Sequence, residues 1–308
     1  TASDSEDARR VASKLDIPYY VLDYTESFSK NVVENFTQMY AQGLTPNPCV
    51  ECNRSVKFDH FINQAKKLNC DKVATGHYAK IIKNNDKYEL HKADYLDKDQ
   101  SYVLHMLKSS DLENITFPLG EISKPEVRQI AARIGLRTAF KKDSQDICFV
   151  GKKDYRSFVE KRIDLTSPGE IFDTKGNKVG DHNGIHEFTV GQRKGLPGGY
   201  GTPRYVTKIN VQNKNVTIGE KNDLLVSSFI VEELSCVNNL EYKNLTIQTR
   251  YNSEDLPCEI KKLSDTEILV QLKEPAFSVA PGQFGVIYNG TKVVCGGRIS
   301  PKVLENVG

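Results

Sequence analysis

The segment Leu44–Asn53 reads LTPNPCVECN and places two prolines, two asparagines and two cysteines within ten residues. Pro46 and Pro48 fix φ, and each pushes the residue before it toward extended conformations. The segment is therefore predicted to be a rigid loop rather than a helix. It carries Cys49 and Cys52, which form a Cys-x-x-Cys pair.

The sequence on either side of this loop predicts the fold. Apolar residues recur at helical spacing over Phe28–Gln42 and Val56–Leu68, and short apolar runs at Ile17–Leu22 and Lys72–Thr75 predict buried strands. The order strand, helix, loop, helix, strand is typical of an α/β domain with a parallel sheet.

Gly76 and His77 directly follow the second predicted strand. Ligands of open parallel sheets bind beyond the carboxyl ends of the strands, so both residues are candidates for a binding site. A single histidine at such a place is more often a hydrogen-bonded structural residue than a catalytic one.

The chain changes character around Lys152–Lys161. Before this point we expect a hairpin formed by Tyr78–Ile82 and Tyr88–Lys92. We also expect two more helices, over Tyr102–Leu107 and Pro125–Ile134. From Gly169 onward, short β-like runs are separated by Gly, Asn and Asp, which indicates small β-barrels. We therefore predict three domains: 1–155 of α/β type, a central β module over 156–223, and a C-terminal β-barrel over 224–308. Among the expected central strands are Gly169–Phe172 and Phe188–Val190.

The composition is that of an ordinary globular protein. The 308 residues include 38% hydrophobic and 27% charged residues, and the net charge of +2 is too small to predict or exclude nucleic-acid binding. No apolar run approaches the roughly 18–20 residues of a membrane span, so we expect no membrane segment. Seven cysteines are an odd number, which favours a reducing cytoplasm and thiols used for chemistry or packing.

The paired thiols leave several interpretations open. Cys49 and Cys52 are compatible with a catalytic thiol, a redox pair or half of a metal site, although the chain has no second Cys-x-x-Cys to complete a zinc site. Cys148 lies where a polar segment turns apolar, and it is either a second reactive thiol or a structural cysteine. The remaining four cysteines are expected to serve packing: Cys70, Cys236, Cys258 and Cys295.

Taken together, several segments resemble one family. They are TPNPCVECNRSVKFD, ATGHYA, KDQSYVL, KKDSQDICFVG, TVGQRKGL, TRYNSEDLPC, APGQFGVIY and CGGRI, in this order. This combination is similar to the tRNA-specific 2-thiouridylases (the MnmA family), and the similarity extends from Thr1 to Ile299.

The resemblance implies a fold and an activity. The fold would be an adenine-nucleotide α-hydrolase-like (PP-loop ATPase) domain followed by a central β module and a C-terminal β-barrel. The activity would be thiolation of C2 of the wobble uridine of tRNA, with ATP and Mg²⁺ activating the C2 oxygen as an adenylate. It also implies an upstream protein as sulfur donor, and we expect a monomer.

The resemblance also implies site residues. Cys52 matches the nucleophile and Cys148 the persulfide carrier. Gly76 matches an ATP-binding position, and the target-base positions are Asn47, Pro48 and Cys49. The tRNA-contact positions are His77, Lys98, Asp99, Gln100, Arg250, Tyr251 and Gln283. From the residues alone, Lys98-Asp99-Gln100 is expected to be an exposed polar turn.

The chain departs from the family pattern in its phosphate-binding loop. The Ser-Gly-Gly-x-Asp-Ser loop that cradles pyrophosphate at a helix N-terminus does not occur in these residues. The adenine-nucleotide domain is therefore predicted to be incomplete, and residues 1–308 alone are expected not to adenylate tRNA. The alternative is a non-catalytic tRNA-binding protein.

The second departure is Cys49, at a position where better-known members have Asp. Three cysteines, Cys49, Cys52 and Cys148, are thus available at the site. Three thiolates with one open iron position suit a [4Fe–4S] cluster, which is the alternative to a persulfide relay.

Overall fold

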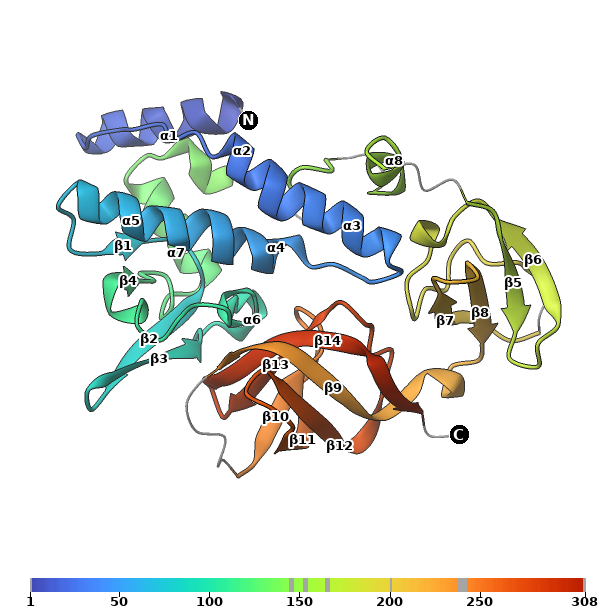
Figure 1. Ribbon diagram of the computed structural model, residues 1–308. Helices are drawn as coiled ribbons and strands as arrows, with labels where there is room; N and C mark the ends of the chain where they lie inside the picture. The colour runs from blue at the N-terminus through green and yellow to red at the C-terminus, as the bar shows by residue number, and fades with distance from the viewer. Residues whose placement is uncertain are drawn as a thin grey trace.

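The computed structural model describes residues 2–143, 147–151, 155–163, 167–199, 201–236 and 243–306. Figure 1 shows three parts. Helices from the first half of the chain lie above a β-barrel formed by its last third, and a smaller β module lies beside both. No described helix is long and apolar enough to cross a membrane.

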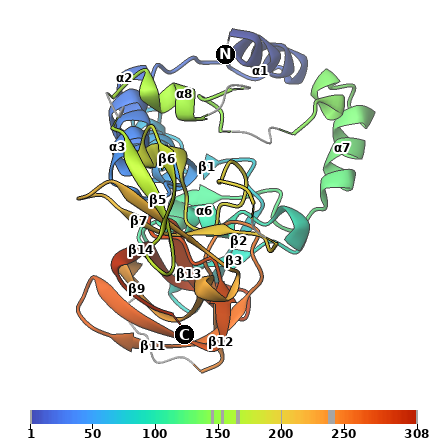
Figure 2. The same cartoon turned by 90° about the vertical axis from the view of Figure 1, so that its right-hand side faces the viewer.

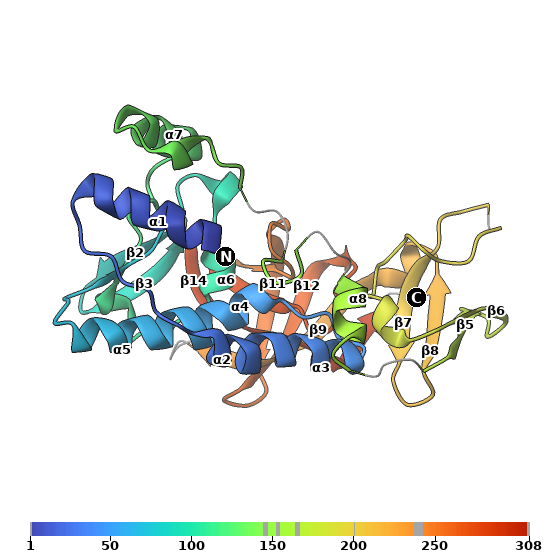
Figure 3. The same ribbon diagram turned by 90° about the horizontal axis from the view of Figure 1, so that it is seen from above.

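Two composite helices cover the upper side. In the first, α2 (Thr25–Phe28) continues through the π-helix η1 (Ser29–Glu34) into α3 (Asn35–Ala41). In the second, α4 (Pro48–Glu51) continues through the π-helix η2 (Cys52–Phe58) into α5 (Asp59–Lys67). Figure 3 shows them side by side. The predicted helices over these two regions are present, and the second begins earlier than expected because Pro48 starts it.

The remaining helices are shorter than these two composite helices. α1 (Ala2–Leu15) meets the end of α7 (Lys124–Arg133) at the top of the molecule, where Lys14 Nζ donates to the carbonyl of Gly135 at 2.9 Å (Figure 2). The other helical segments are η3 (Leu96–Lys98), α6 (Ser101–Leu104), η4 (Leu112–Asn114), η5 (Arg137–Phe140) and α8 (Tyr155–Glu160).

In the α/β part, a parallel strand pair joins β1 (Val73–Ala74) to β4 (Ile115–Thr116). The prediction of a buried strand over Ile17–Leu22 was wrong. This segment is irregular, and Val21 is 71% exposed. A strand needs a hydrogen-bonding neighbour, and β1, the nearest strand in sequence, pairs with β4 in the described residues.

The predicted hairpin forms from β2 (Ala79–Asn84) and β3 (Lys87–Lys92), and Asn85 adopts φ +53° in its two-residue turn. β3 also pairs with the last strand of the barrel, β14 (Lys292–Asn306), at His91 and Lys292. The hairpin therefore extends the barrel sheet into the α/β part.

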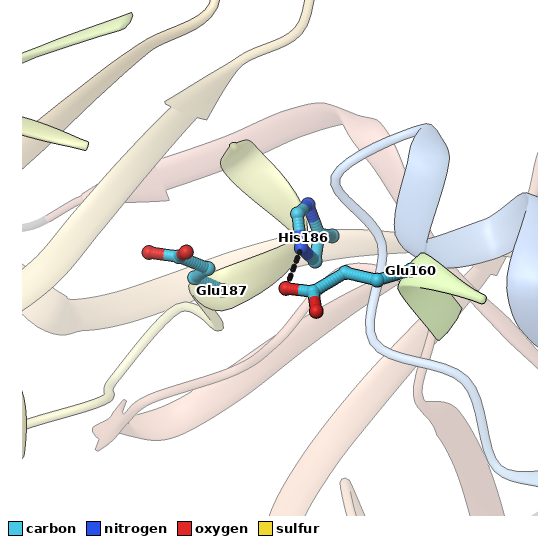
Figure 4. A group of neighbouring side chains, drawn as sticks. All are labelled: Glu160, His186 and Glu187. Carbon is cyan, nitrogen blue, oxygen red and sulfur yellow. Dashed lines mark hydrogen bonds and ion pairs between the residues drawn. The ribbon is translucent and has the colours of Figure 1, made fainter. Parts of the chain in front are cut away.

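The central module is a four-stranded sheet in the order β6-β5-β8-β7. Its elements are β5 (Gly169–Asp173), β6 (Lys178–His182), η6 (Ile185–Glu187), β7 (Tyr205–Asn210) and β8 (Asn215–Gly219). The strand predicted at Phe188–Val190 is absent, and Gly191 turns the chain there with φ +87°. The buried His186 joins η6 to α8, with Nε2 3.1 Å from Oε1 of Glu160 (Figure 4).

The C-terminal strands form a closed barrel in the order β13-β10-β11-β12-β9-β14, with β13 pairing back to β14. After η7 (Asn222–Leu224), the strands are β9 (Leu225–Cys236), β10 (Leu245–Gln248), β11 (Leu256–Lys262), β12 (Glu267–Phe277), β13 (Phe284–Asn289) and β14. Fully buried aliphatic side chains such as Val231, Ile247 and Ile268 fill its interior. The predicted barrel is confirmed.

Candidate functional site

The proline-cysteine segment combines an extended loop with a helix start. Asn47 caps α4, with its Oδ1 accepting the N–H of Cys49 at 3.2 Å, and Pro48 occupies the first turn. Proline is well tolerated there because its missing N–H would have no partner within the helix. The prediction of a loop over the whole of Leu44–Asn53 was therefore wrong for its second half. Cys49 lies in the first turn of α4, and Cys52 is the first residue of η2.

The structure places three thiols within electrostatic range of one another. The Cys49 and Cys148 side chains are exposed and that of Cys52 is half-buried. Although part of Cys49 reaches the surface, the surrounding protein partly desolvates its thiol, and desolvation is the largest influence on both Cys49 and Cys52 and raises the pKa of both thiols. A negative charge on Cys148 would raise the pKa of both further. Cys148 therefore lies within electrostatic range of both, although it is 96 positions after Cys52 in the sequence.

An aromatic cluster holds the turn that carries Cys148. The N–H of Val150 donates to the carbonyl of Ile147 at 3.1 Å and closes the turn. The ring centroid of Phe149 lies 5.2 Å from that of Phe36 and 5.5 Å from that of Phe28. Both partners belong to the composite helix α2–η1–α3, so this helix sets the position of Cys148 relative to α4.

The barrel supports the loop from below. The N–H of Thr45 donates to the carbonyl of Pro281 at 2.9 Å, and Nε2 of Gln283 donates to the carbonyls of Thr45 and Pro46 at 3.2 and 3.4 Å. Gln283 was predicted as a tRNA contact; in the structure its amide holds the backbone of the loop.

Two predicted site residues follow β1. Gly76 is exposed, and a Cβ there would meet only Leu119 Cδ1, at 3.8 Å. His77 is buried, with Nδ1 2.8 Å from Oγ1 of Thr75 and its ring 5.9 Å from those of Phe58 and Phe117.

Burial, reinforced by the charge of Lys57, lowers the pKa of His77 to about 3, so the imidazole is neutral at physiological pH. This environment favours the structural interpretation of His77 over a tRNA contact.

The polar triplet that opens α6 differs from its prediction. Asp99 is buried, and its carboxylate accepts the N–H of Ala93 at 2.8 Å and the hydroxyl of Ser101 at 2.6 Å. Burial nevertheless raises the pKa of Asp99. The expectation of an exposed turn was wrong because these donors give the carboxylate an interior site. Lys98 pairs with Asp143 at 3.1 Å, and Gln100 accepts the N–H of Tyr78 at 3.0 Å.

A cavity of about 560 Å³ lies between the α/β part and the barrel. Its lining includes Asp99, Tyr251 and Asp255. Burial, then the charges of Asp99 and Cys49, raise the pKa of the Tyr251 phenol, so Tyr251 lies within electrostatic range of the Cys49 thiol. Arg250, the neighbouring predicted tRNA contact, is exposed.

Sequence patterns missed Lys57 and Arg298. Lys57 lies in the π-helix η2, whose hydrogen bonds join residues five apart, so a search at the usual helical period does not relate it to Cys52, on whose thiol its positive charge acts. Arg298 lies on β14 and contacts Glu51 of α4, a contact that only the tertiary structure creates.

The chain is similar in sequence to known proteins over almost its whole length. The chain is 43% identical over 302 residues to the tRNA-specific 2-thiouridylase MnmA of Lachnoclostridium phytofermentans, covering 96% of this chain and 84% of the relative. It is 42% identical to proteins of the same name from Chloroflexus aggregans, over 306 residues, and Rickettsia prowazekii, over 305 residues; each match covers 97% of this chain and 85% of the relative. The chain belongs to the tRNA-specific 2-thiouridylase family.

Each of the three parts of the chain matches a different family model. A "tRNA methyl transferase HUP domain" matches residues 1–152, a "tRNA methyl transferase PRC-barrel domain" matches 156–220, and an "Aminomethyltransferase beta-barrel domain" matches 226–299. The predicted fold class, an α/β domain with a parallel sheet followed by a central β module and a C-terminal β-barrel, is confirmed.

Proposed function

We propose that this protein transfers sulfur to C2 of the wobble uridine of tRNA, forming 2-thiouridine. The observation that carries the proposal is the approach of the thiols of Cys52 and Cys148, which lie within electrostatic range of each other although they are far apart in the sequence. Thiolation of tRNA is the activity named in the relatives, and two neighbouring thiols are what a sulfur relay requires.

ATP with Mg²⁺ is the proposed co-substrate, and it supplies the leaving group by converting the C2 oxygen to an adenylate. A nucleotide fits the exposed backbone at Gly76, since this residue follows a parallel strand and a side chain there would meet little. The backbone amides at the end of β1 are the groups available to contact it.

Sulfur transfer then divides between two cysteines. The terminal sulfur of a persulfide on Cys148 attacks C2, and the C2–O bond to the adenylate breaks with release of AMP. The thiolate of Cys52 attacks Sγ of Cys148, which breaks the S–S bond and leaves 2-thiouridine. The enzyme is left with a Cys52–Cys148 disulfide. A thiol reductant then reduces this disulfide to two thiols. Both cysteines are free thiols in the structure.

The substrate would occupy the space between the domains. Asn47, Pro48 and Cys49 present a helix start to the target base, and Tyr251 offers an aromatic face at the edge of the cavity. A cavity of about 560 Å³ is within the range of small-ligand sites, and a base that leaves its stack is commonly held between aromatic and apolar groups. Arg250 is placed to contact phosphates, which position the tRNA without reading its sequence.

The exposed thiol of Cys148 is open to a protein sulfur donor, which we propose loads the persulfide. We further propose that the enzyme acts as a cytoplasmic monomer.

The family-model descriptions mention methyl transfer, whereas the relatives' names specify thiolation. The thiols decide between these chemistries in our proposal. The persulfide relay uses two thiols, one that carries the sulfur and one that releases it, and the structure offers such a pair in Cys148 and Cys52.

A second route is supported by the third thiol. Cys49, Cys52 and Cys148 lie within electrostatic range of one another, so three thiolates are available for a [4Fe–4S] cluster. Anaerobic purification followed by iron analysis tests this route. Full activity without iron or cluster absorbance would exclude it.

The test of the main proposal uses the protein expressed from its native gene in cells that lack their own 2-thiouridylase. We expect Cys52→Ser and Cys148→Ser each to abolish 2-thiouridine in tRNA, measured by nucleoside mass spectrometry. Cys70→Ser is the matched control, because Cys70 is exposed in the loop that follows α5. Retained thiolation in either site variant would remove that cysteine from the mechanism.

A further inference from the structure

Three cationic side chains converge on one carboxylate in the α/β part. Nζ of Lys98 lies 3.1 Å from Oδ2 of Asp143, and Nζ of Lys124 and Nη2 of Arg128 each lie 3.2 Å from Oδ1. Hydrogen bonds from Lys98 and then Lys124 lower the pKa of Asp143 to about 2, so this carboxylate is charged at neutral pH. The three cations therefore form an anion site whose present occupant belongs to the chain itself.

The start of α7 supplies two of the three cations. Lys124 is the first residue of α7 and Arg128 the fifth, and residues four apart lie on the same face of a helix. The partial positive charge of a helix N-terminus also favours an anion at this end. The nearby carboxylate of Glu126 is engaged elsewhere, since its Oε2 accepts the N–H of Ser123 at 2.9 Å in the cap of the helix.

The cations outnumber the anion. Three positive charges face the single negative charge of Asp143, and in the part of the chain that the structure describes none of the three pairs with another carboxylate. The three cationic side chains keep between 29 and 42% of their surface exposed. Ion pairs this exposed contribute little to stability, so stability does not explain why three like charges are held together. The site has room for more negative charge and is open to solvent.

The site adjoins the places proposed for both substrates. Nζ of Lys124 lies 5.6 Å from the ring centroid of Tyr78, which comes two residues after Gly76. The N–H of Tyr78 donates to Gln100 at 3.0 Å, in the polar triplet that begins with Lys98. A phosphate presents charged oxygens much as a carboxylate does, and Lys and Arg are its usual partners. Phosphate is therefore the substrate group that matches this site.

We propose that Lys98, Lys124 and Arg128 bind a phosphate group of a substrate, and that the carboxylate of Asp143 occupies their site until this phosphate displaces it. The inference rests on the proposed function, which takes tRNA and ATP as substrates. The phosphate belongs either to the tRNA backbone or to ATP, and the two arms of the test separate these sources.

The test measures binding by the protein expressed from its native gene. One arm follows the fluorescence anisotropy of a labelled tRNA transcript with uridine at the wobble position, without ATP, and the other follows ATP binding by calorimetry, without tRNA. We expect Asp143→Asn to bind the tRNA about three- to tenfold more tightly at about 50 mM salt, because the competing anion is gone. Lys124→Met should bind it about three- to tenfold more weakly, with a salt dependence that is less steep by about one phosphate contact.

Matched variants separate the site from general charge effects. Asp86→Asn removes the same charge from the exposed hairpin turn, and Lys66→Met removes an exposed lysine from α5; both are expected to stay within about twofold of the parent. In a background that already carries Lys124→Met and Arg128→Met, Asp143→Asn should no longer tighten binding, because the cations that Asp143 blocks are absent.

Tighter ATP binding by Asp143→Asn, with tRNA binding unchanged, would support the phosphate site and assign it to the nucleotide. The inference is overturned if Asp143→Asn binds both substrates no more tightly than the parent while circular dichroism shows it folded. It is also overturned if Asp143→Asn tightens binding equally without the two cations of α7. Failure of the proposed function looks different: Cys52→Ser and Cys148→Ser would then retain thiolation in cells, whatever the binding constants are.

Discussion

The guanidinium of Arg298 lies between two carboxylates from different domains. Its Nη2 is 3.4 Å from Oε1 of Glu51 and 3.1 Å from Oε2 of Glu233, and its Nη1 is 2.8 Å from Sδ of Met39. Glu51 is the last residue of α4, directly before Cys52. The barrel therefore contacts the helix that precedes Cys52 through a buried charge as well as through the backbone of the loop.

We expect Arg298→Leu to lower the free energy of unfolding by about 3 kcal/mol, because it leaves the buried Glu51 with only one cationic partner. Denaturant unfolding with a reversibility check measures this change. Lys302→Leu on the same strand is the control. Lys302 pairs with Glu232 and Glu267 on the surface, where ion pairs contribute little. Equal loss in both variants would contradict the role of the buried pair.

Gly282 is expected to tolerate no side chain. Its φ is +90°, and a Cβ would lie 2.8 Å from both Cβ of Leu44 and the backbone N of Thr45. Gly282→Ala should therefore combine backbone strain with displacement of the proline-cysteine loop and cost about 3 kcal/mol. Gly290→Ala shares the positive φ but meets nothing within 4 Å, so about 1 kcal/mol is expected. Thermal unfolding compares the two, and a similar shift in melting temperature would mean that crowding at Leu44 is not important.

How far the sequence predicts this structure depends on the range of the interaction. Local chemistry predicted the hairpin over Tyr78–Ile82 with Tyr88–Lys92 and the helix over Pro125–Ile134, since turn and helix preferences act within a few residues. The apolar run Ile17–Leu22 has the composition of a strand, but composition does not supply the neighbour that a strand needs. Asp99 likewise looked solvated because the N–H of Ala93, which binds it, is fixed only by the tertiary fold.

The site shows the same division. The paired thiols are visible in the sequence, whereas the partnership of Cys52 with Cys148 came from the family resemblance, and the role of Asn47 as a helix cap came from the structure. Their approach depends on the packing of Phe149 against a helix more than 100 residues earlier. Lys57 was missed because a π-helix changes which residues share a face.

His77 should make stability depend on pH. Its pKa is about 3 in the folded protein and about 6.5 when unfolded, so between these values the unfolded state binds one more proton. His77 therefore does not reduce the free energy of unfolding above about pH 6.5. As the pH decreases from there toward 3, its protonation in the unfolded state lowers the free energy of unfolding by about 1.4 kcal/mol per pH unit. We expect His77→Asn to flatten the pH dependence of the unfolding free energy between pH 6 and 4.5. An identical slope in the variant would show that the folded protein accepts the proton on His77.

Phe149 should control the approach of Cys148 to Cys52. Phe149 directly follows Cys148, and its ring packs against those of Phe36, Phe28 and Phe158. Phe149→Ala should cost about 2 kcal/mol of stability and, because the turn loses its anchor, slow formation of the Cys52–Cys148 disulfide by a mild oxidant such as diamide. Phe140→Ala, at a ring that is 80% exposed, is the control and should change neither quantity. If Phe149→Ala were destabilised yet formed the disulfide at the parental rate, the aromatic cluster would support the fold without positioning the thiol.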